Sequence, residues 1–360
     1  MAPIRVLVVE DSLTVRRRLC DVIGADPALE VVGEAEDGKQ AIQLCQRLRP
    51  DVVTMDMMLP LMSGLGATEY IMAHCPTPIL IVSSSTNRGE LFKTYEALAA
   101  GAIEVLEKPL GHEVDGMWER HFIATVKLIS RIRVITHPRA RLGGLGQART
   151  ESQPVASALP SLPRQRHEVV VIGASTGGPG AILEILRALP LPFPLPILFV
   201  LHIGEPLGAA FAEWLDGQTG MRVSYARDGD VVSTKVGQVT MAPPESHLVA
   251  RNGRLRLTQD PPRHSCRPSV DVLFESVARE YGAAVIASLL TGMGRDGAAG
   301  LLEVRRCGGF TIAQDEGTSV VYGMPREAVL LGAVAQVLPL AQIGPALSAL
   351  AAHTRAGRMP

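Results

Sequence analysis

The feature that most constrains the fold is an apolar run that leads into a glycine-rich turn and then into a helical pattern. The stretch Glu168-Val-Val-Val-Ile-Gly-Ala-Ser175-Thr-Gly-Gly178 begins with β-branched residues, which indicate a buried strand. Apolar residues at helical spacing follow, from Ala181 to Leu189, so the small residues between form a sharp turn. Ser175 lies in this turn, close to the unpaired N–H groups of the helix's first turn. These groups can stabilise a developing negative charge, so we expect Ser175 to be a nucleophile.

The local motif alone leaves its role open. Gly173-Ala-Ser175-Thr-Gly177 fits G-x-S-x-G, but this pattern also matches many turns that are purely structural. A dinucleotide-binding loop would need glycine in place of Ser175, and the P-loop pattern does not occur. Catalysis therefore needs support from residues elsewhere in the chain.

Composition excludes several classes of protein. A chain of 360 residues is long enough for two domains, and 35 basic against 36 acidic residues give no nucleic-acid-binding signature. No apolar run reaches membrane-spanning length or resembles a signal peptide, so we expect no direct membrane insertion. The cysteines are odd in number, form no C-x-x-C and favour a reducing cytoplasm. They are Cys20, Cys45, Cys75, Cys266 and Cys307.

The N-terminal part of the chain alternates apolar strand patterns with amphipathic helical patterns. This alternation predicts an α/β fold with a five-stranded parallel sheet and helices on both faces, whose ligands bind at the carboxyl ends of the strands. The expected strands are Ile4–Val9, Val31–Gly33, Val52–Met55, Ile79–Val82 and Ile103–Leu106.

Charged and polar residues follow four of these strands. Glu10 and Asp11 follow the first, Asp56 the third, Ser83 ends the fourth, and Lys108 follows the fifth. Three converging carboxylates repel one another unless they bind a cation, and an all-oxygen site that leaves room for phosphate suits Mg²⁺. Asp56 is then a candidate nucleophile toward phosphorus, with Lys108 and Ser83 as partners of the transferred group.

This joint pattern resembles the receiver domain of two-component response regulators across about the first third of the chain. The resemblance implies a flavodoxin-like fold in which Asp56 accepts a phosphoryl group from a histidine kinase. It also implies that Glu10, Asp11 and Asp56 hold Mg²⁺ and that Ser83 and Lys108 sense the phosphoryl group.

A change of composition separates the two halves of the chain. Residues 137–166 mix Pro, Gly, Ser, Gln and Arg with little periodicity, as a flexible tether does. We therefore expect a first domain over residues 1–136 and a second over residues 167–360.

In the second domain, a base and an acid also follow strand patterns. His202 directly follows the predicted strand Ile197–Leu201. Asp296 lies in a glycine-rich loop after the predicted strand Ala283–Leu290. In a parallel sheet these residues and Ser175 meet at one edge, where the imidazole can take the serine proton and the carboxylate can orient the imidazole. The order Ser, His, Asp differs from the Ser, Asp, His order of α/β-hydrolases.

Other residues have weaker claims. Asp315 is a rival to Asp296 as the acid, and Asp271 lies early in a helical pattern, where capping explains it. His247 and His264 lie in Pro-rich stretches; a role in a substrate cleft is possible for both, but we expect plain loop histidines.

Several motifs of the second domain together resemble the chemotaxis protein-glutamate methylesterase family. They are Gly173-Ala-Ser-Thr-Gly-Gly178, His202, Arg267-Pro-Ser-Val-Asp-Val-Leu-Phe274, Leu290-Thr-Gly-Met-Gly294 with Asp296, and Ala313-Gln-Asp-Glu316 through Tyr322-Gly-Met-Pro325. The resemblance implies a doubly wound α/β domain with a mostly parallel sheet and an N-terminal receiver.

The same resemblance implies a substrate and partners. The substrate would be methyl esters of glutamates on the cytoplasmic helices of chemoreceptors, and the same site would deamidate certain receptor glutamines. The esterase site would need no cofactor, and a CheA-type kinase would be the phosphodonor of the receiver. Ser175, His202 and Asp296 would form the catalytic triad, and backbone N–H groups near Thr176 and Met293 are our oxyanion-hole candidates.

The competing hypothesis is a non-enzymatic signalling adaptor, in which the receiver switches a binding surface and Ser175 has no catalytic role. A transcription factor is less well supported, because no basic helix-turn-helix follows the tether. For an enzyme, we expect that the unphosphorylated receiver inhibits hydrolysis.

Overall fold

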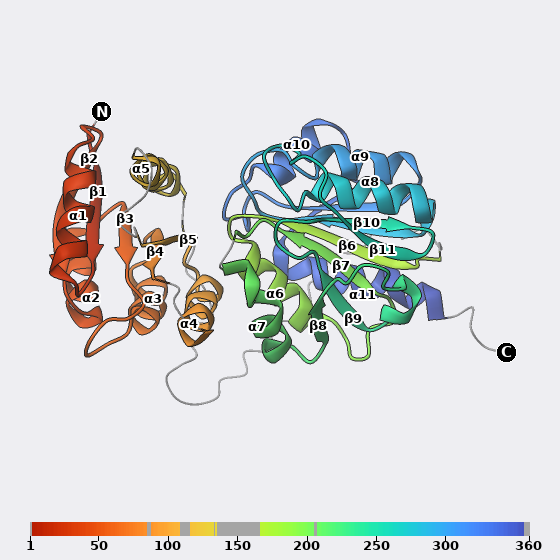
Figure 1. The fold of residues 1–360 in the computed structure, drawn as a ribbon, viewed down its shortest axis with the longest axis horizontal. Coiled ribbons are helices and arrows are strands. Elements are labelled where there is room, and N and C mark those ends of the chain that lie inside the picture. The colour runs from red at the N-terminus through yellow and green to blue at the C-terminus, as the bar shows by residue number, and fades with distance from the viewer. Residues whose placement is uncertain are drawn as a thin grey trace. The chain divides into compact units, whose positions relative to one another are not determined.

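The computed structural model describes residues 2–84, 88–108, 116–132, 134, 166–204 and 207–355, without the side chains of residues 209 and 353–355. The chain divides into two compact units, each built around its own parallel sheet (Figure 1). Almost all of the expected tether, residues 137–165, lies outside the described residues.

The first unit contains the predicted five-stranded sheet. Its strands are β1 (Ile4–Val9), β2 (Leu29–Ala35), β3 (Val52–Met55), β4 (Ile79–Ser83) and β5 (Glu104–Glu107). They lie in the order β2-β1-β3-β4-β5, and every neighbouring pair is parallel. The prediction of a flavodoxin-like sheet is confirmed. Only β2 is markedly longer than its apolar pattern suggested, because the exposed Glu30 and Glu34 interrupt that pattern before the buried Leu29 and Ala35 at its ends.

Five helices accompany this sheet in two rows. They are α1 (Leu13–Gly24), α2 (Gly38–Leu48), α3 (Gly64–His74), α4 (Arg88–Ala99) and α5 (Met117–Ile129). Helix α1 packs beside α5, and α3 packs between α2 and α4. The central strand β1 is buried between the rows, with Val6 to Val9 at most 1% exposed. This burial explains why β1 has a continuous apolar pattern, and it leaves only the strand ends open to ligands.

The second unit contains a larger sheet in the order β14-β13-β12-β6-β7-β9-β8. The strands are β6 (Val169–Ala174), β7 (Ile197–Leu201), β8 (Arg222–Tyr225), β9 (Gln238–Met241), β12 (Val285–Leu289), β13 (Phe310–Gln314) and β14 (Gln336–Leu338). Every pair is parallel, which confirms the predicted doubly wound α/β class. A separate antiparallel hairpin joins β10 (His247–Arg251) to β11 (Arg254–Thr258).

Helices cover both faces of this sheet. They are α6 (Gly178–Ala188), α8 (Val270–Tyr281), α9 (Ala298–Arg306), α10 (Met324–Leu330) and α11 (Leu340–Arg355), with short 3₁₀ turns at Val232–Lys235 and Gly282–Ala284. A further 3₁₀ turn (Leu207–Ala209) and helix α7 (Phe211–Gln218) lie between β7 and β8 in the chain. Helices α6 and α11 pack together on one face, and α8 and α9 pack together on the other (Figure 1). Strand β6 lies in the middle of the sheet and is fully buried, so the turn that follows it is held on a rigid support.

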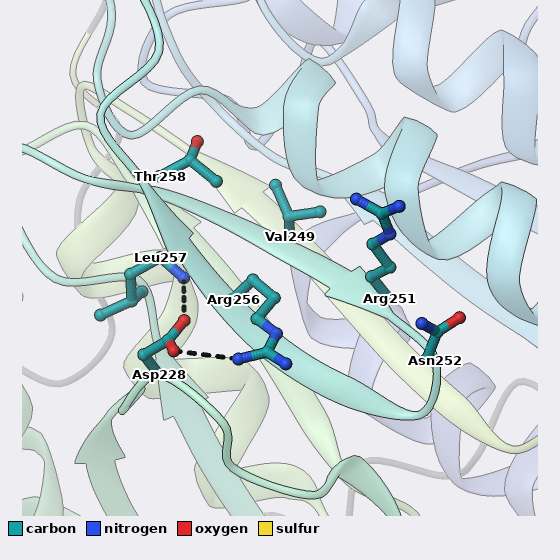
Figure 2. Close-up of a pocket in the computed structure, with 7 residues that line it drawn as sticks. All are labelled: Asp228, Val249, Arg251, Asn252, Arg256, Leu257 and Thr258. Carbon is teal, nitrogen blue, oxygen red and sulfur yellow. Dashed lines mark hydrogen bonds and ion pairs between the residues drawn. The ribbon is translucent and has the colours of Figure 1, made fainter.

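The hairpin carries a pocket of about 420 Å³ whose arginines are partly neutralised (Figure 2). Arg256 Nη1 lies 3.1 Å from Asp228 Oδ2, and the N–H of Leu257 donates to Asp228 Oδ1 at 3.1 Å. None of the predicted site residues lines this pocket. Among the described residues, no helix is both long and apolar enough to cross a membrane.

Close packing of α8 against α9 predicts a sensitive position at Gly300. A Cβ atom on this residue would lie 2.7 Å from Phe274 Cβ and 3.0 Å from Asp271 Cα, neither of which can move without displacing α8. Gly300→Ala should therefore lower the free energy of unfolding by about 1–3 kcal/mol, as overpacking does. Chemical denaturation followed by circular dichroism measures the change.

Gly217→Ala is the matched control, because no atom lies within 4 Å of the added Cβ in α7. Alanine has a higher helix propensity than glycine, so this variant should be as stable as the unaltered protein or slightly more stable. Equal stability of the two variants would contradict the packing argument.

Candidate functional site

The first cluster of predicted site residues lies at the carboxyl ends of β1, β3 and β5. Glu10 and Asp56 are buried, and the N–H of Asp56 donates to the Val9 carbonyl at 3.0 Å, which holds the two strand ends together. Oxygen atoms of Glu10, Asp11 and Asp56 lie within 4.8 Å of one another. Lys108 Nζ lies 2.9 Å from Glu10 Oε2 and 2.9 Å from Asp56 Oδ2. The sequence therefore placed these four side chains together correctly.

Electrostatics in this cluster favour an added cation. Burial raises the pKa of Glu10 to about 7, and the negative charge of Asp56 adds to the rise, although Lys108 opposes it. Burial alone would lower the pKa of Lys108, but its hydrogen bonds to Glu10 and Asp56 outweigh burial and raise it. The single ammonium group of Lys108 thus pairs with two buried carboxylates. An oxygen-only donor set of this kind fits a hard divalent cation such as Mg²⁺.

Ser83 supplies a free hydroxyl at the same edge of the sheet. It ends β4, and its carbonyl accepts the N–H of Lys108 at 2.9 Å, so the residue lies beside the charged cluster. Its Oγ is buried and has no hydrogen-bond partner among the described residues. A buried hydroxyl without a partner costs free energy, so a bound group that accepts its hydrogen bond would be stabilised.

The second cluster lies where three adjacent strands of the larger sheet end. Strand β6 lies between β12 and β7, and Ser175 follows β6 as predicted. The N–H of His202 donates to the Ala174 carbonyl at 3.0 Å, and the N–H of Ser175 donates to the Thr291 carbonyl at 3.0 Å. These backbone bonds fix Ser175 beside His202 on one side and beside the loop after β12 on the other.

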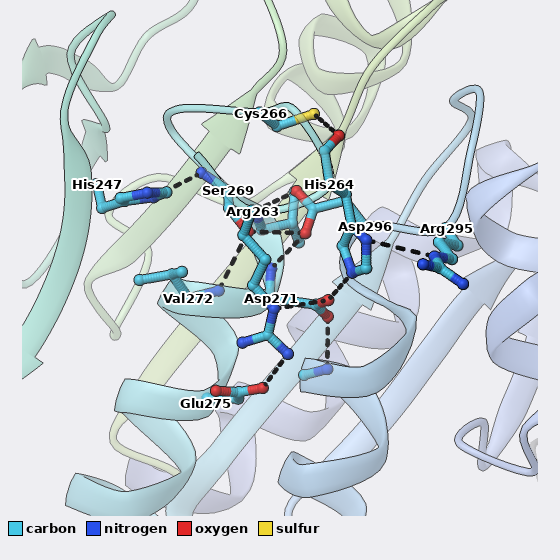
Figure 3. Close-up of polar contacts among 12 residues, drawn as sticks. His247, Arg263, His264, Cys266, Ser269, Asp271, Val272, Glu275, Arg295 and Asp296 are labelled. Carbon is cyan, nitrogen blue, oxygen red and sulfur yellow. Dashed lines mark hydrogen bonds and ion pairs between the residues drawn. The ribbon is translucent and has the colours of Figure 1, made fainter. Parts of the chain in front are cut away.

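His202 and Asp296 form the predicted pair. His202 Nε2 lies 2.8 Å from Asp296 Oδ2, and Asp296 is only 2% exposed. The carboxylate also accepts the Ser269 hydroxyl at 2.7 Å and the N–H groups of Val270 at 2.7 Å and Asp271 at 3.1 Å (Figure 3). The first turn of α8 therefore binds the acid, as helix N-termini bind anions.

This environment sets the protonation of both partners. Burial would raise the pKa of Asp296, but the His202 hydrogen bond and charge, with the α8 bonds, hold it below its usual value. Burial would lower the pKa of His202, but the bonds and charges of Asp296 and Cys266 raise it to about 9. When His202 is neutral, its proton is on Nε2, which donates a hydrogen bond to Asp296. The lone pair is then on Nδ1.

Nδ1 is therefore the ring nitrogen that can act as a base. It lies 3.7 Å from Cys266 Sγ, and no hydrogen bond joins Ser175 Oγ to His202 within the part of the chain that the structure describes. Catalytic hydrogen bonds are often loose before substrate binds, so this separation does not remove Ser175 as the nucleophile.

The oxyanion candidates lie in the two loops beside Ser175. Thr291 Oγ1 donates to the Thr176 carbonyl at 3.0 Å and accepts the N–H of Val321 at 2.9 Å, which braces the turn. A Cβ on Gly292 would lie 2.8 Å from Ser175 Cβ, so Met293 is one residue beyond a very close backbone contact. This closeness explains the need for glycine at position 292.

Several weaker interpretations of the sequence were wrong or incomplete. Asp271 does not cap its own helix; it is fully buried, accepts the N–H of Gly300 at 2.6 Å and thereby caps α9. His247 is not a loop histidine but is fully buried at the start of β10, where Nδ1 accepts the N–H of Ser269 at 3.1 Å (Figure 3). Asp315 binds Thr318 in a local turn and is not the partner of His202.

Two contributors to the site were missed. Ser269 precedes a helical pattern, as an N-cap residue does, and this signal could have placed it at the start of α8. Cys266 had no signal in the sequence, because its contact with His202 spans 64 residues and depends on tertiary structure.

Comparisons with known proteins identify the families that both parts of the chain resemble. The family model described as CheB methylesterase matches residues 170–347, and the response regulator receiver domain model matches residues 6–114. A protein-glutamate methylesterase/protein-glutamine glutaminase of Nitrosospira multiformis is 42% identical over 353 residues, covering 97% of this chain and 98% of that protein. Protein-glutamate methylesterase/protein-glutamine glutaminase 2 of Anaeromyxobacter dehalogenans is 44% identical, covering 97% of each chain.

A solved structure is also similar to about half of the chain. It is the crystal structure of the Thermotoga maritima CheB methylesterase catalytic domain, with 38% sequence identity and a TM-score of 0.49. The similarity covers 52% of this chain and 100% of that one.

The contacts of His202 predict its titration. In the folded protein the His202 pKa should be about 9, and Asp296→Asn should lower it well below that value, because burial then dominates. Nuclear magnetic resonance of labelled histidine measures both values. Asp315→Asn is the control and should leave the His202 pKa unchanged.

The same shift predicts a dependence of stability on pH. A pKa raised in the folded state adds stability that is complete below about 6.5 and disappears as the pH rises through about 9. This part of the pH dependence should be absent from Asp296→Asn. A His202 that titrates near 6.5 in both proteins would contradict the pairing.

Proposed function

Because this chain belongs to the CheB methylesterase family and carries a receiver domain, we propose that it hydrolyses γ-methyl esters of glutamates on chemoreceptors and releases methanol. The observation that carries the proposal is the hydrogen-bonded pair of His202 and the buried Asp296 beside the Ser175 turn. The relatives' names also support deamidation of receptor glutamines at the same site. They favour this reading over a non-enzymatic adaptor.

The proposed mechanism uses the triad that the sequence predicted. Ser175 Oγ attacks the ester carbonyl while His202 Nδ1 takes the hydroxyl proton, and the protonated ring then gives this proton to the departing methoxide. Asp296 holds the ring by Nε2 and stabilises its charged form. A water molecule, activated by the same Nδ1, hydrolyses the acyl-serine and frees the glutamate and the enzyme.

The negative charge on the attacked oxygen needs donors that are already in place. We propose the backbone N–H groups of Thr176 and Met293, each worth roughly 3 kcal/mol of transition-state stabilisation. The bracing of both loops by Thr291 supports this role, because it limits movement of the donors during the reaction.

We further propose that residues 1–136 form the regulatory receiver, residues 137–166 the tether and residues 167–360 the esterase domain. Asp56 would accept a phosphoryl group from a CheA-type kinase, with Glu10, Asp11 and Asp56 holding Mg²⁺. The ion would neutralise charge on the transferred group. The raised pKa of Glu10 supports a cation at this place, since a positive charge would favour its ionised form.

Lys108 and Ser83 would detect the phosphoryl group. Lys108 already pairs with Asp56, and the buried Ser83 hydroxyl has no partner among the described residues, so both can bind the added oxygens. We propose that the unphosphorylated receiver inhibits the esterase and that phosphorylation relieves inhibition. A tenfold rise in activity needs a change of only about 1.4 kcal/mol. The proposed setting is the cytoplasm, with the cytoplasmic helices of methylated chemoreceptors as substrate.

Loss of the nucleophile should abolish turnover. Ser175→Ala should reduce methanol release from membranes that carry methylated receptors by about 10⁴-fold or more, as loss of a catalytic serine does in serine hydrolases. Ser348→Ala is the control, because its hydroxyl only binds the Gly344 carbonyl within α11. Unchanged release by Ser175→Ala would refute the mechanism and favour the adaptor.

Loss of the phosphoryl acceptor should remove regulation. With Mg²⁺ and an acyl phosphate as donor, methanol release by the unaltered protein should rise, whereas Asp56→Asn should show no rise. Asp21→Asn, an exposed residue of α1, is the matched control and should respond normally. Equal stimulation of Asp56→Asn would place the acceptor elsewhere.

A further inference from the structure

Cys266 is held at the catalytic histidine by a tight turn. The N–H of Cys266 donates to the Arg263 carbonyl at 2.8 Å, and the N–H of Arg263 donates back to the Cys266 carbonyl at 3.1 Å. Between them, His264 and Ser265 both have positive φ angles, of 50° and 62°. This two-residue turn fixes the direction of the Cys266 side chain, whose Sγ lies 3.7 Å from His202 Nδ1.

The distance between these two atoms matches a pair of zinc ligands. Zn–S bonds of about 2.3 Å and Zn–N bonds of about 2.0–2.1 Å, at a tetrahedral angle, separate sulfur and nitrogen by about 3.6 Å. At the observed 3.7 Å, Sγ and Nδ1 could therefore bind one ion with almost no change in their separation.

The groups around the pair also suit a metal. In the neutral ring, Nε2–H donates a hydrogen bond to Asp296 and the lone pair is on Nδ1, and a carboxylate behind a ligating histidine is a common arrangement in zinc sites. Asp296 is itself held by the start of α8, so the imidazole is oriented before any ion binds. His202, Cys266 and Asp296 together form one of the clusters of metal-ligating side chains among the described residues.

We propose that His202 Nδ1 and Cys266 Sγ form a binding site for a zinc ion, which inhibits the esterase reversibly. Binding displaces the thiol proton of Cys266 and, where the imidazole is charged, the Nδ1 proton of His202 to solvent, and it leaves two zinc positions for water. The ion binds the lone pair of His202 Nδ1, which would otherwise accept the Ser175 proton. The nucleophile can then no longer be activated. The inhibition rests on the proposed role of His202, whereas the binding of zinc does not.

Donor chemistry separates this site from the receiver cluster. Thiolate and imidazole prefer zinc to magnesium, whereas the three carboxylates of the receiver prefer hard cations such as magnesium. An excess of Mg²⁺ should therefore occupy the receiver without inhibiting the esterase.

A neighbouring cluster is the main competitor for zinc. His264, Asp271 and Asp296 also lie close together, but His264 Nε2 already bonds Asp271 Oδ2 at 3.2 Å and Arg295 lies beside its other ring nitrogen (Figure 3). A metal there would have to displace these contacts. At the Cys266 site a metal displaces only the long thiol contacts with His202 Nδ1, at 3.7 Å, and with the His264 carbonyl, at 3.4 Å.

The binding test uses the full chain with excess Mg²⁺ and a chromogenic zinc chelator of known affinity. The unaltered protein should take one more zinc ion from the chelator than Cys266→Ser does. Cys307→Ser is the matched control, because Cys307 is another partly buried free thiol, and it should bind as the unaltered protein does. Cys266→Ala gives a second comparison if serine disturbs the turn.

The inhibition test measures methanol release at buffered free zinc, relative to the zinc-free rate of each variant. The zinc concentration for half inhibition should rise at least tenfold in Cys266→Ser and stay unchanged in Cys307→Ser. Equal zinc binding by Cys266→Ser and the unaltered protein overturns the site, as does a zinc ion lost in His264→Ala but kept in Cys266→Ser. Zinc that binds through Cys266 without slowing hydrolysis overturns the inhibition.

Failure of the proposed function gives a different result. In that case the unaltered protein releases no methanol at any zinc concentration, while the chelator titration still decides whether Cys266 and His202 hold the ion.

Discussion

One buried carboxylate organises the second domain's site. Asp296 accepts hydrogen bonds from the imidazole of His202, from the Ser269 hydroxyl and from two N–H groups at the start of α8. These contacts join the end of β7, the loop after β12 and the N-terminus of a helix. A buried charge is stable only when it is paired and hydrogen-bonded, so the fold must bring all three elements together for Asp296 to stay ionised once it is buried. Its ionisation, in turn, fixes which nitrogen of His202 is free.

The two domains apply the same architectural rule to different chemistry. In each, side chains at the carboxyl ends of adjacent parallel strands converge because the strands themselves are buried. The first domain brings together carboxylates, one lysine and a serine hydroxyl, a set that favours hard cations and phosphoryl oxygens. The second brings together hydroxyl, imidazole and thiol around a single acid, a set that favours nucleophilic chemistry and softer metals. The donor atoms, and not the sheets, set what each edge can bind.

Much of this could be predicted because the informative residues directly follow strands with clear apolar patterns. The pattern of Ile197–Leu201 gave β7 at its observed bounds, and it placed His202 at the sheet edge without any knowledge of its neighbours. Asp296 was harder to place, since it lies several residues beyond β12, and only the glycine-rich loop suggested that it turns back toward the sheet. Asp271 and His247 were misjudged because polar residues near helix starts and prolines are usually exposed, whereas the packing of α8 against α9 and β10 buries both.

By itself, the sequence determined the five-stranded sheet of the first domain and the strands β6, β7 and β12 of the second, with the residue types at their ends, because periodicity and strand-end position are local properties of the chain. Only the tertiary structure decided that the N-terminus of α8 meets Asp296, that the imidazole presents Nδ1 as its free nitrogen, and that the turn before α8 places Cys266 against that nitrogen. These outcomes depend on how loops far apart in the chain cross above the sheet, and no local pattern encodes a contact between residues 202 and 266.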